Sequence, residues 1–300
     1  MNRVHNADVT IGGCVLGRQP ASPPPRRGAA GVAAAALSVL LIGCAPSAVA
    51  TLPNQHGVSE ARAKPTGAPA AATASVDQQA ADQSNPVGVA ILDRATGEVA
   101  YGRLAQQPMY SASLSKVIVA VELLERHRVT PQDRFAMRRA LGPSDDQAMN
   151  ALWDRYGGSS LITAAANRMK LQQTRPPDEP GRWGDTVTSA RDMAAVYQHL
   201  LAEMPAADRD FVLDALHAAP SRAADGVNQK FGLMAVDAQA VKSGWMCCQK
   251  ATVWVHSAGV VDPGRRYVVA LLTAQPSSVG YGEAIEDINE VSRTAVTRLR

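Results

Sequence analysis

Tyr110-Ser-Ala-Ser-Leu-Ser-Lys-Val-Ile-Val-Ala-Val-Glu-Leu-Leu124 is the stretch of this 300-residue chain that says most about its architecture. Apolar residues recur densely after Leu114, which predicts a buried helix running to about His127. Ser113 then lies at the helix N-terminus, where unpaired N–H groups and the helix dipole favour a developing anion. Lys116 lies one turn further on the same face, so its amine can take the proton of a serine hydroxyl if its pKa is depressed.

Segments on both sides of this stretch predict a sheet built from the two ends of the folded region. Residues 87–92 and 98–101 are separated by a turn at residues 94–97, and together they form a predicted β-hairpin. Strands are also expected at residues 239–243, 252–255 and 267–272, and the chain closes with an amphipathic helix over residues 282–300. Five further helices are expected between them, beginning near residues 131, 146, 160, 190 and 205.

This order of elements predicts an α/β protein of the α+β type, with one antiparallel sheet flanked by helices and an additional all-helical lobe. The segment before residue 87 is rich in Ala, Pro, Ser, Thr and Gln, so it buries too little apolar surface to offset its ordering entropy. The predicted boundaries are 1–43 for an N-terminal extension with a signal peptide, 44–86 for a disordered tether, and 87–300 for the folded domain, whose α/β lobe comprises 87–127 and 219–300 and whose helical lobe comprises 128–218.

Two more short motifs follow the Ser113-Leu-Ser-Lys116 pair in the sequence. Ser144-Asp-Asp146 opens a helix in the all-helical stretch, and Lys242-Ser-Gly244 lies on a strand near the C-terminus, followed by Trp245. Each motif alone is commonplace, since the first is an ordinary helix cap and the second an ordinary strand end. Together they match, in order and on the expected elements, a serine–lysine pair at a helix start, a second serine in a helical lobe and a lysine motif on a strand.

The three motifs resemble the serine penicillin-recognising superfamily of class A β-lactamases and D,D-peptidases, and the resemblance covers residues 87–300. Within it, the chain is most similar to the LppW type of alanine-rich mycobacterial lipoprotein. That finer similarity rests on the cysteine after the apolar segment, the Ser-Asp-Asp motif, the loop ending in Arg182-Trp183, and Gly244-Trp-Met-Cys-Cys248.

The resemblance implies roles for the motif residues. Ser113 would be the acylated nucleophile, Lys116 its general base, and Ser144 a proton relay to the leaving nitrogen. The backbone N–H groups of Ser113 and Trp245 would form an oxyanion hole, which stabilises a transition state by a few kcal/mol. The residues implied to bind substrate are Asp146, Lys242, Ser243, Gly244 and Trp245, with Lys242 and Ser243 holding a substrate carboxylate.

The sequence also departs from the superfamily pattern. Asp146 stands where the family has Asn, and an ionised Asp cannot donate a hydrogen bond to a substrate carbonyl. It would also repel a substrate carboxylate unless Lys116 or Lys242 neutralises it. Asp178 and Glu179 are the only carboxylates between residues 172 and 184, and neither has the context of the family's deacylating Glu, so fast β-lactam turnover is not expected.

The N-terminal region indicates secretion and lipid attachment. A pair of arginines at residues 26–27, an apolar stretch over residues 29–42 and Cys44 follow one another as in a bacterial lipoprotein signal. The stretch is too short to remain as a spanning helix. We therefore expect a lipid, such as palmitate, on Cys44 and a domain tethered to the extracytoplasmic face of the cell membrane. A plain secretory signal with an incidental Cys is the alternative.

Other ligand classes find little support. No Cys or His cluster has metal-ligand spacing, so neither a metal nor another cofactor is expected. The net charge is only +3 with scattered basic residues, and aromatic residues make up 4%, which argues against nucleic acid as a partner. Cys247 and Cys248 are adjacent, and the sequence leaves open whether they form a vicinal disulfide or two free thiols.

Three functions fit these observations. The first is a slow serine acyl transferase that acts on peptidoglycan peptides or β-lactams, favoured by the presence of Ser113, Lys116, Ser144 and Lys242 together. The second is a degenerate member that binds a muropeptide or an envelope protein without turnover, and the third is a tethered scaffold with no working site. Asp146 and the missing Glu favour the last two.

Overall fold

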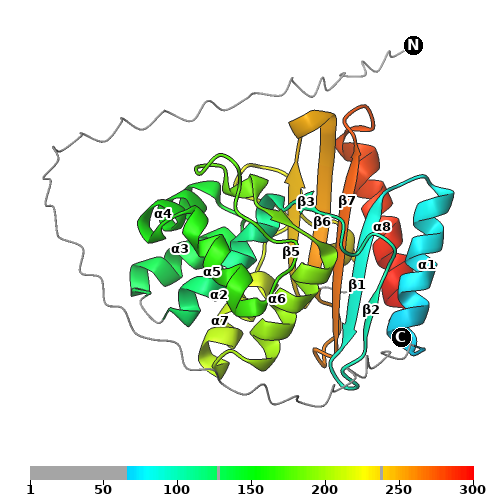
Figure 1. Cartoon of the computed structure of the whole chain (residues 1–300), viewed down its shortest axis with the longest axis horizontal. Coiled ribbons are helices and arrows are strands. Elements are labelled where there is room, and N and C mark those ends of the chain that lie inside the picture. Colours follow the sequence, from blue (N-terminus) through cyan, green and yellow to red (C-terminus); the bar gives the residue numbers. More distant parts are fainter. Residues whose placement is uncertain (1–65, 127–128, 237–238) are drawn as a thin grey trace, which may run out of the picture. The chain divides into compact units, whose positions relative to one another are not determined.

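The antiparallel sheet expected from the two ends of the folded region is present in the computed structural model, which describes residues 66–126, 129–236 and 239–300 (Figure 1). Its strands are β1 (Val87–Asp93), β2 (Val99–Tyr101), β5 (Ala240–Met246), β6 (Thr252–Val260) and β7 (Tyr267–Pro276). They run in the order β2-β1-β7-β6-β5, and every neighbouring pair is antiparallel. The predicted hairpin is therefore confirmed, and β5, which carries the lysine motif, lies at an edge of the sheet.

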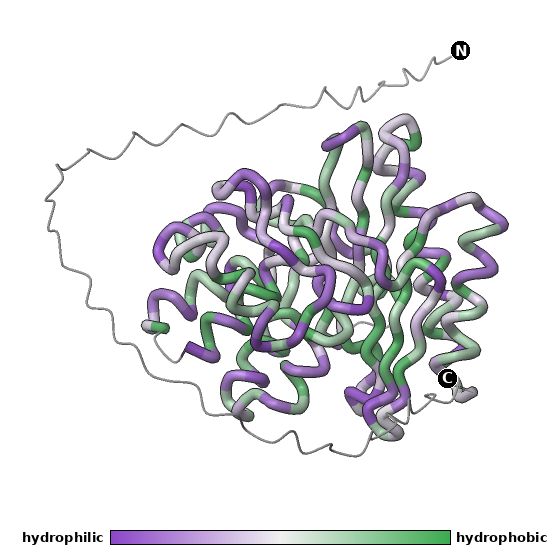
Figure 2. The backbone as a smooth tube through the Cα atoms, in the orientation of Figure 1, coloured by the Kyte–Doolittle hydropathy of each residue, from purple (hydrophilic) through white to green (hydrophobic). Residues whose placement is uncertain are grey.

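Helices cover both faces of this sheet (Figure 1). The central strands β1 and β7 are consequently buried along nearly their whole length, with Val89 opposite Leu271 and Ala90 opposite Ala270. Figure 2 shows the same strands as a continuous hydrophobic band. Two separate apolar clusters result, one on each face of the sheet.

The helices divide unequally between the two faces. On one face lie α1 (Ala68–Asp82) and α8 (Gly280–Leu299), and on the other lie α2 (Ser115–Glu125), α3 (Pro131–Leu141), α4 (Asp146–Tyr156), α5 (Ser159–Met169), α6 (Ala190–Ala202) and α7 (Ala206–His217). The short pair β3 (Met109–Tyr110) and β4 (Val187–Thr188) forms a second, two-stranded sheet.

Capping side chains fix several of the predicted helix starts. The Thr130 hydroxyl accepts from the backbone N–H of Asp133, whose carboxylate accepts in turn from the Thr130 N–H, so α3 begins with a complete capping box. Asp145 accepts from the Ala148 N–H at 3.0 Å and caps α4. Ser189 caps α6 through the Asp192 N–H in the same way. These helix starts are confirmed because their signals are local in sequence.

Helix α1 corrects the expected extent of the disordered tether. Residues 68–82 fall inside the predicted tether, yet they form a helix whose buried face includes Ala72, Val76 and Ala80. These small side chains repeat every four residues, so they line one face and pack against α8 and β1. The prediction of disorder was wrong here because composition alone does not reveal a partner surface, and the remaining tether residues before 66 lie outside the described residues.

The predicted division into lobes also differs from the structure. Helix α6 lies within the predicted helical lobe, but it packs directly on β1, β6 and β7. Helix α2 was assigned to the lobe with the sheet, but its principal helical neighbour is α5. The two lobes therefore interlock along α2 and α6 instead of separating at residues 127 and 218.

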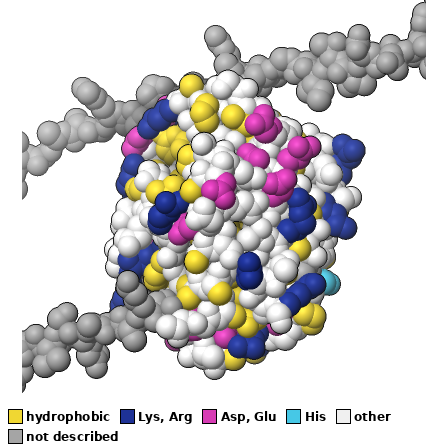
Figure 3. Space-filling model, turned by 90° about the vertical axis from the view of Figure 1, so that its right-hand side faces the viewer, with side chains coloured by type: hydrophobic (Ala, Val, Ile, Leu, Met, Phe, Trp, Pro, Cys, Tyr) yellow, Lys and Arg dark blue, Asp and Glu magenta, His cyan; other side chains and the backbone are white. Residues whose placement is uncertain are grey.

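The side chains on the outer surface of α1 and α8 are mixed in charge. Figure 3 views the molecule from that side and shows acidic and basic side chains interspersed with small hydrophobic areas. Among the described residues, no helix combines the length and apolar character needed to cross a membrane.

Candidate active site

Ser113 is presented by a tight turn between β3 and α2. It lies in a 3₁₀ turn, η1 (Ala112–Leu114), which leads directly into the long helix. Ala112 adopts a left-handed backbone with φ of +46°, a conformation that costs a non-glycine residue about 1 kcal/mol or more. The strained turn places Ser113 at the floor of a pocket with 7% of its surface exposed.

Lys116 is buried one turn further along, with 1% of its surface exposed. Its amine donates to the Ser144 carbonyl at 2.7 Å, to the Ser144 hydroxyl at 3.0 Å and to Asp146 Oδ1 at 2.7 Å. All three donors of the ammonium group are therefore satisfied. Ser144, and not Lys116, is the hydrogen-bond partner of the Ser113 hydroxyl.

Ser144 is the hub that joins the three motifs. Its Oγ lies 3.0 Å from Ser113 Oγ, 3.0 Å from Lys116 Nζ and 3.0 Å from Lys242 Nζ. Ser144 also has a left-handed backbone, with φ of +57°, immediately before the Asp145 cap of α4. The structure therefore brings the side chains of Ser113, Lys116, Ser144 and Lys242 together.

The two lysines share one buried space, and this changes their acidity. Burial lowers the pKa of Lys116, while the adjacent Asp146 carboxylate opposes that shift. Burial lowers the pKa of Lys242 much further, and the positive charge of Lys116 adds to that effect. Lys242 is therefore the more readily neutral amine of the pair.

Asp146 forms an ion pair with Lys116 while remaining at the rim of the site. Its side chain is 63% exposed, although Oδ1 contacts the fully buried Lys116 amine. Lys116 therefore neutralises the negative charge of Asp146. Asp225 faces the same hollow from the loop between α7 and β5, and its Oδ2 accepts from Trp245 Nε1 at 3.1 Å.

The motif Lys242-Ser-Gly244 on β5 reaches the site mainly through its backbone and less through its side chains. A Cβ on Gly244 would lie 3.3 Å from the backbone nitrogen of Ser113, so glycine allows β5 to approach η1. Ser243 is fully buried, and its hydroxyl donates to Met234 Sδ at 3.4 Å. Lys242 is likewise buried behind the pocket, so the structure does not place Lys242 and Ser243 where they were expected to hold a substrate carboxylate.

A small pocket of about 140 Å³ opens over Ser113. It adjoins a shallower hollow of about 310 Å³ that shares Asp146 and Asp225 with it and includes Ser144. The pocket is lined by Ala112, Ser113, Asp146, Trp183, Gly184, Asp225, Trp245 and Met246.

Trp183 and Asp225 are site residues that sequence reasoning did not assign. Trp183 donates from Nε1 to Asn150 Oδ1 at 2.7 Å, and Lys116 Nζ lies 4.8 Å from its ring centroid. Lys242 Nζ lies 5.6 Å from the ring of Trp245. Trp183 belongs to a loop that carries part of the family resemblance, whereas Asp225 lies in a loop with no motif around it.

The loop before β4 supplies no carboxylate to the pocket. Asp178 is 82% exposed and pairs with Arg175 at 3.7 Å, and Glu179 is also exposed. Neither residue is among those that line the pocket over Ser113. Asp178 and Glu179 are therefore not placed to activate a deacylating water at Ser113.

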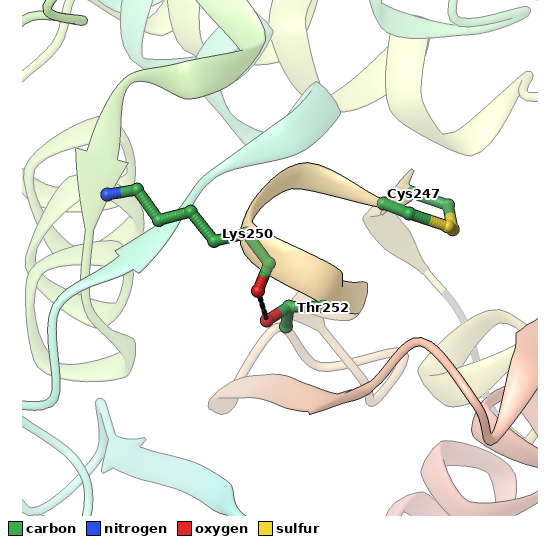
Figure 4. The surroundings of a disulfide bond; sticks show 4 residues. Cys247, Lys250 and Thr252 are labelled. Carbon is green, nitrogen blue, oxygen red and sulfur yellow. Dashed lines mark hydrogen bonds between the residues drawn. A yellow bond between two sulfur atoms is a disulfide. The ribbon is translucent and has the colours of Figure 1, made fainter.

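Cys247 and Cys248 form a vicinal disulfide directly after β5, which resolves the alternative left open by the sequence (Figure 4). The turn continues to Lys250, whose carbonyl accepts from the Thr252 hydroxyl at 3.0 Å and whose amine lies 5.0 Å from the ring of Tyr110. Across residues 66–126, 129–236 and 239–300, no three His, Cys, Asp or Glu side chains converge as a metal site requires.

Comparisons with known proteins agree with this geometry. Residues 128–299 match the family model of the β-lactamase enzyme family. LppW of Mycobacterium tuberculosis (strain ATCC 25618 / H37Rv), whose name classes it as a candidate lipoprotein, is 35% identical over 217 residues, covering 67% of this chain and 68% of that protein. LppW of Mycobacterium bovis (strain ATCC BAA-935 / AF2122/97) matches to the same extent.

Solved structures share the fold at low sequence identity. The class A β-lactamase from Mycobacterium abscessus gives a TM-score of 0.59 at 16% identity, covering 75% of this chain and 98% of that chain. A β-lactamase from Chitinophaga pinensis DSM 2588 gives a TM-score of 0.61 at 14% identity, covering 74% and 97%. Because the family match spans more than half of the sequence and a relative is 35% identical, the chain belongs to the β-lactamase enzyme family.

Proposed function

We propose that this chain is a cell-envelope lipoprotein whose β-lactamase-like domain acts as a slow serine acyl transferase on β-lactams or peptidoglycan peptides. One observation carries the proposal. Ser144 Oγ lies 3.0 Å from Ser113 Oγ and 3.0 Å from the amines of both Lys116 and Lys242. A hydroxyl connected to two amines of lowered pKa in a buried space is suited to proton transfer during nucleophilic attack.

The chemistry follows from these contacts. Ser113 Oγ attacks the carbonyl carbon of an amide, and its proton passes through the Ser144 hydroxyl to Lys116 in molecules whose Lys116 amine is neutral, a form that burial favours and Asp146 opposes. The C–N bond then breaks, and the leaving nitrogen takes a proton returned through Ser144. The backbone N–H groups of Ser113 and Trp245 would stabilise the oxyanion, which is supported by the close approach of Gly244 to the Ser113 nitrogen.

The same residues favour slow release of the acyl group. The pocket over Ser113 holds about 140 Å³; of its two carboxylates, Asp146 is paired with Lys116 and Asp225 is held by Trp245 and Val227, while the hydroxyl of Ser113 contacts Ser144. Water attack on an ester needs a general base within hydrogen-bond reach. We therefore expect the acyl-enzyme to accumulate.

A second function, binding without turnover, is favoured by the Lys116–Asp146 ion pair. At 2.7 Å, the carboxylate stabilises the charged form of the amine that the reaction needs neutral. A domain with this pair intact would bind a muropeptide or an envelope protein partner without acylation.

Intact-mass measurement separates the two functions. The purified full chain would be incubated with a fluorescent penicillin, with Ser113→Ala as control and Ser115→Ala as a matched variant, because the Ser115 hydroxyl bonds to Ala112 O instead of Ser144. We expect an adduct in the parent and in Ser115→Ala, and none in Ser113→Ala. No adduct after prolonged incubation would contradict the acyl transferase and leave the binding function.

The lipid anchor is a separate part of the proposal, because Cys44 lies outside the described residues. It is supported by the 35% identity to LppW, whose name classes it as a candidate lipoprotein. Metabolic labelling with an alkyne palmitate in a mycobacterial host should label the parent and not Cys44→Ser. Equal labelling of both chains would contradict lipid attachment at Cys44.

A further inference from the structure

The pocket over Ser113 combines acidic and aromatic groups in a way that points to its ligand. Asp146 and Asp225 face it from two different elements, and the indoles of Trp183 and Trp245 line it as well. We propose that this pocket selects acyl substrates that carry an ammonium group close to the reacting carbonyl. The inference deepens the proposed acyl transfer at Ser113 and rests on it.

The charge balance of the walls argues for a cation. The pocket over Ser113 is lined by two carboxylates and by no cationic side chain. The adjoining hollow adds Asp145 and one guanidinium, Arg139, which form an ion pair with each other and so cancel. The two lysine amines lie behind the wall, where Lys116 balances one carboxylate and burial lowers the pKa of Lys242.

Asp225 is the carboxylate whose negative charge is not balanced by a cationic side chain of the pocket. Its Oδ2 accepts from the neutral indole N–H of Trp245 at 3.1 Å, and its Oδ1 accepts from the backbone N–H of Val227 at 3.0 Å. Both donors are uncharged, so they orient the carboxylate without neutralising it. A substrate carboxylate placed against Asp225 would be repelled, whereas an ammonium group at the same point would be attracted.

The indoles strengthen the same preference. A cation near the face of a tryptophan ring gains about 0.5–2 kcal/mol, depending on its desolvation. The protein already uses one ring in this way, since the Nζ of Lys116 lies 4.8 Å from the Trp183 ring. A ligand ammonium between these rings and Asp225 would meet the combination of aromatic faces and a carboxylate that suits such groups.

The test uses three thioesters of N-benzoylglycine that differ only in the leaving thiol. One carries the trimethylammonium group of thiocholine, one carries the uncharged 3,3-dimethylbutyl isostere, and one carries the carboxylate of thioglycolate. Binding would be measured by calorimetry with the Ser113→Ala full chain, so that no acylation interferes. Thiol release and intact mass would be followed with the parent chain.

We expect the thiocholine ester to bind about tenfold more tightly than its isostere, and the thioglycolate ester to bind more weakly than both. Asp225→Asn should reduce the preference for the cation about fivefold. Asp154→Asn, on the exposed side of α4, makes the same change in charge away from the pocket and should leave the preference unaltered.

Three results would overturn the inference: equal affinity for the thiocholine ester and its isostere, an unchanged preference in Asp225→Asn, or no binding of the thiocholine ester at about 1 mM. A preference for the cation without thiol release or an adduct in the parent chain would contradict the acyl transferase and leave the cation pocket standing. If all three esters acylated the parent chain at equal rates and bound with equal affinity, the acyl transferase would stand and the cation pocket would be contradicted.

Discussion

The two faces of the sheet differ in the side chains that they bury. On one face, the reactive face of the proposed function, Ser113, Lys116 and Lys242 each contact Ser144 in a buried polar network. On the other, α1 and α8 pack against β1 and β7 through apolar side chains, with Val76 and Ile288 fully buried. Burying two amines is costly even when each is hydrogen-bonded, whereas burying aliphatic surface is favourable. The described residues form an apolar cluster on each face, and the cluster under α1 and α8, the apolar face, stabilises the fold without the cost of these buried amines.

The largest loss in the free energy of unfolding is expected when a charge is placed on the apolar face. Val76 is fully buried between α1 and the sheet, so Val76→Asp should lower the free energy of unfolding by about 4 kcal/mol, because no described partner would compensate the carboxylate. Urea unfolding followed by circular dichroism at pH 7 would measure it.

The matched variant Val76→Ala removes volume without adding charge and should cost about 2 kcal/mol. Labelling of Ser113 by penicillin in the still-folded fraction should be unchanged in both variants. Equal costs for Asp and Ala at this position would mean that α1 does not bury Val76 in solution.

His256 lies on β6, with its ring in contact with β3, and gives the next largest effect. Its Nε2 donates to the Tyr110 carbonyl at 2.7 Å, and its Nδ1 accepts from the Thr273 N–H at 3.2 Å, so the ring is neutral and holds β3 on the sheet. Complete burial lowers the pKa of His256 to about 4. The unfolded chain, with a pKa near 6.5, takes up the proton first.

Stability should therefore be full above pH 6.5 and fall by about 3 kcal/mol as the pH decreases from 6.5 to 4. His256→Gln should flatten this slope, while His217→Gln, at an exposed histidine, should not. Urea midpoints at half-unit pH steps would show it. A slope that survives His256→Gln would assign the acid sensitivity to other groups.

On the reactive face, Asp146→Asn sharpens the comparison by removing charge without removing volume. Asp146 raises the pKa of Lys116 against the effect of burial, so its loss should lower that pKa further and increase the neutral fraction of the amine. If Lys116 is the base, the rate of acylation by penicillin at neutral pH should rise about fivefold, since a partly exposed ion pair is worth about 1 kcal/mol.

The readout is the pH profile of acylation, whose acidic limb should move to lower pH. Asp154→Asn, at the other end of α4, serves as the control for a change in net charge. If the acidic limb of the pH profile did not move in Asp146→Asn, Lys116 would not be the group that accepts the proton of Ser113.

Much of the fold and part of the site could be predicted because the signals were local. The turn and alternation of residues 87–101, the caps at Thr130, Asp145 and Ser189, and the three serine and lysine motifs each depend on a few neighbouring residues. Helix α1 could not be predicted, because its Ala and Thr side chains become a buried face only when α8 lies opposite.

The same reasoning explains the misjudged site residues. The direction of the Ser243 side chain depends on the register of β5 against β6, where Ser243 is opposite Ser257, and not on the motif itself. Asp225 reaches the pocket only because its loop folds back to the Trp245 indole. Tertiary contacts of this kind leave no pattern in a single sequence.

The smallest effect is expected at the polar edge of the apolar face. Glu290 of α8 accepts from the side chains of Gln79 in α1 at 3.5 Å and of Gln83, directly after α1, at 2.6 Å. Because these groups are near solvent and alanine has the higher helix propensity, Glu290→Ala should change the free energy of unfolding by less than about 0.5 kcal/mol. Ile288→Ala, two residues earlier on the buried side of α8, should cost about 3 kcal/mol. If urea unfolding instead gave the larger loss for Glu290→Ala, α1 would be held by hydrogen bonds at its edge, and the contrast between the apolar face and the reactive face would fail.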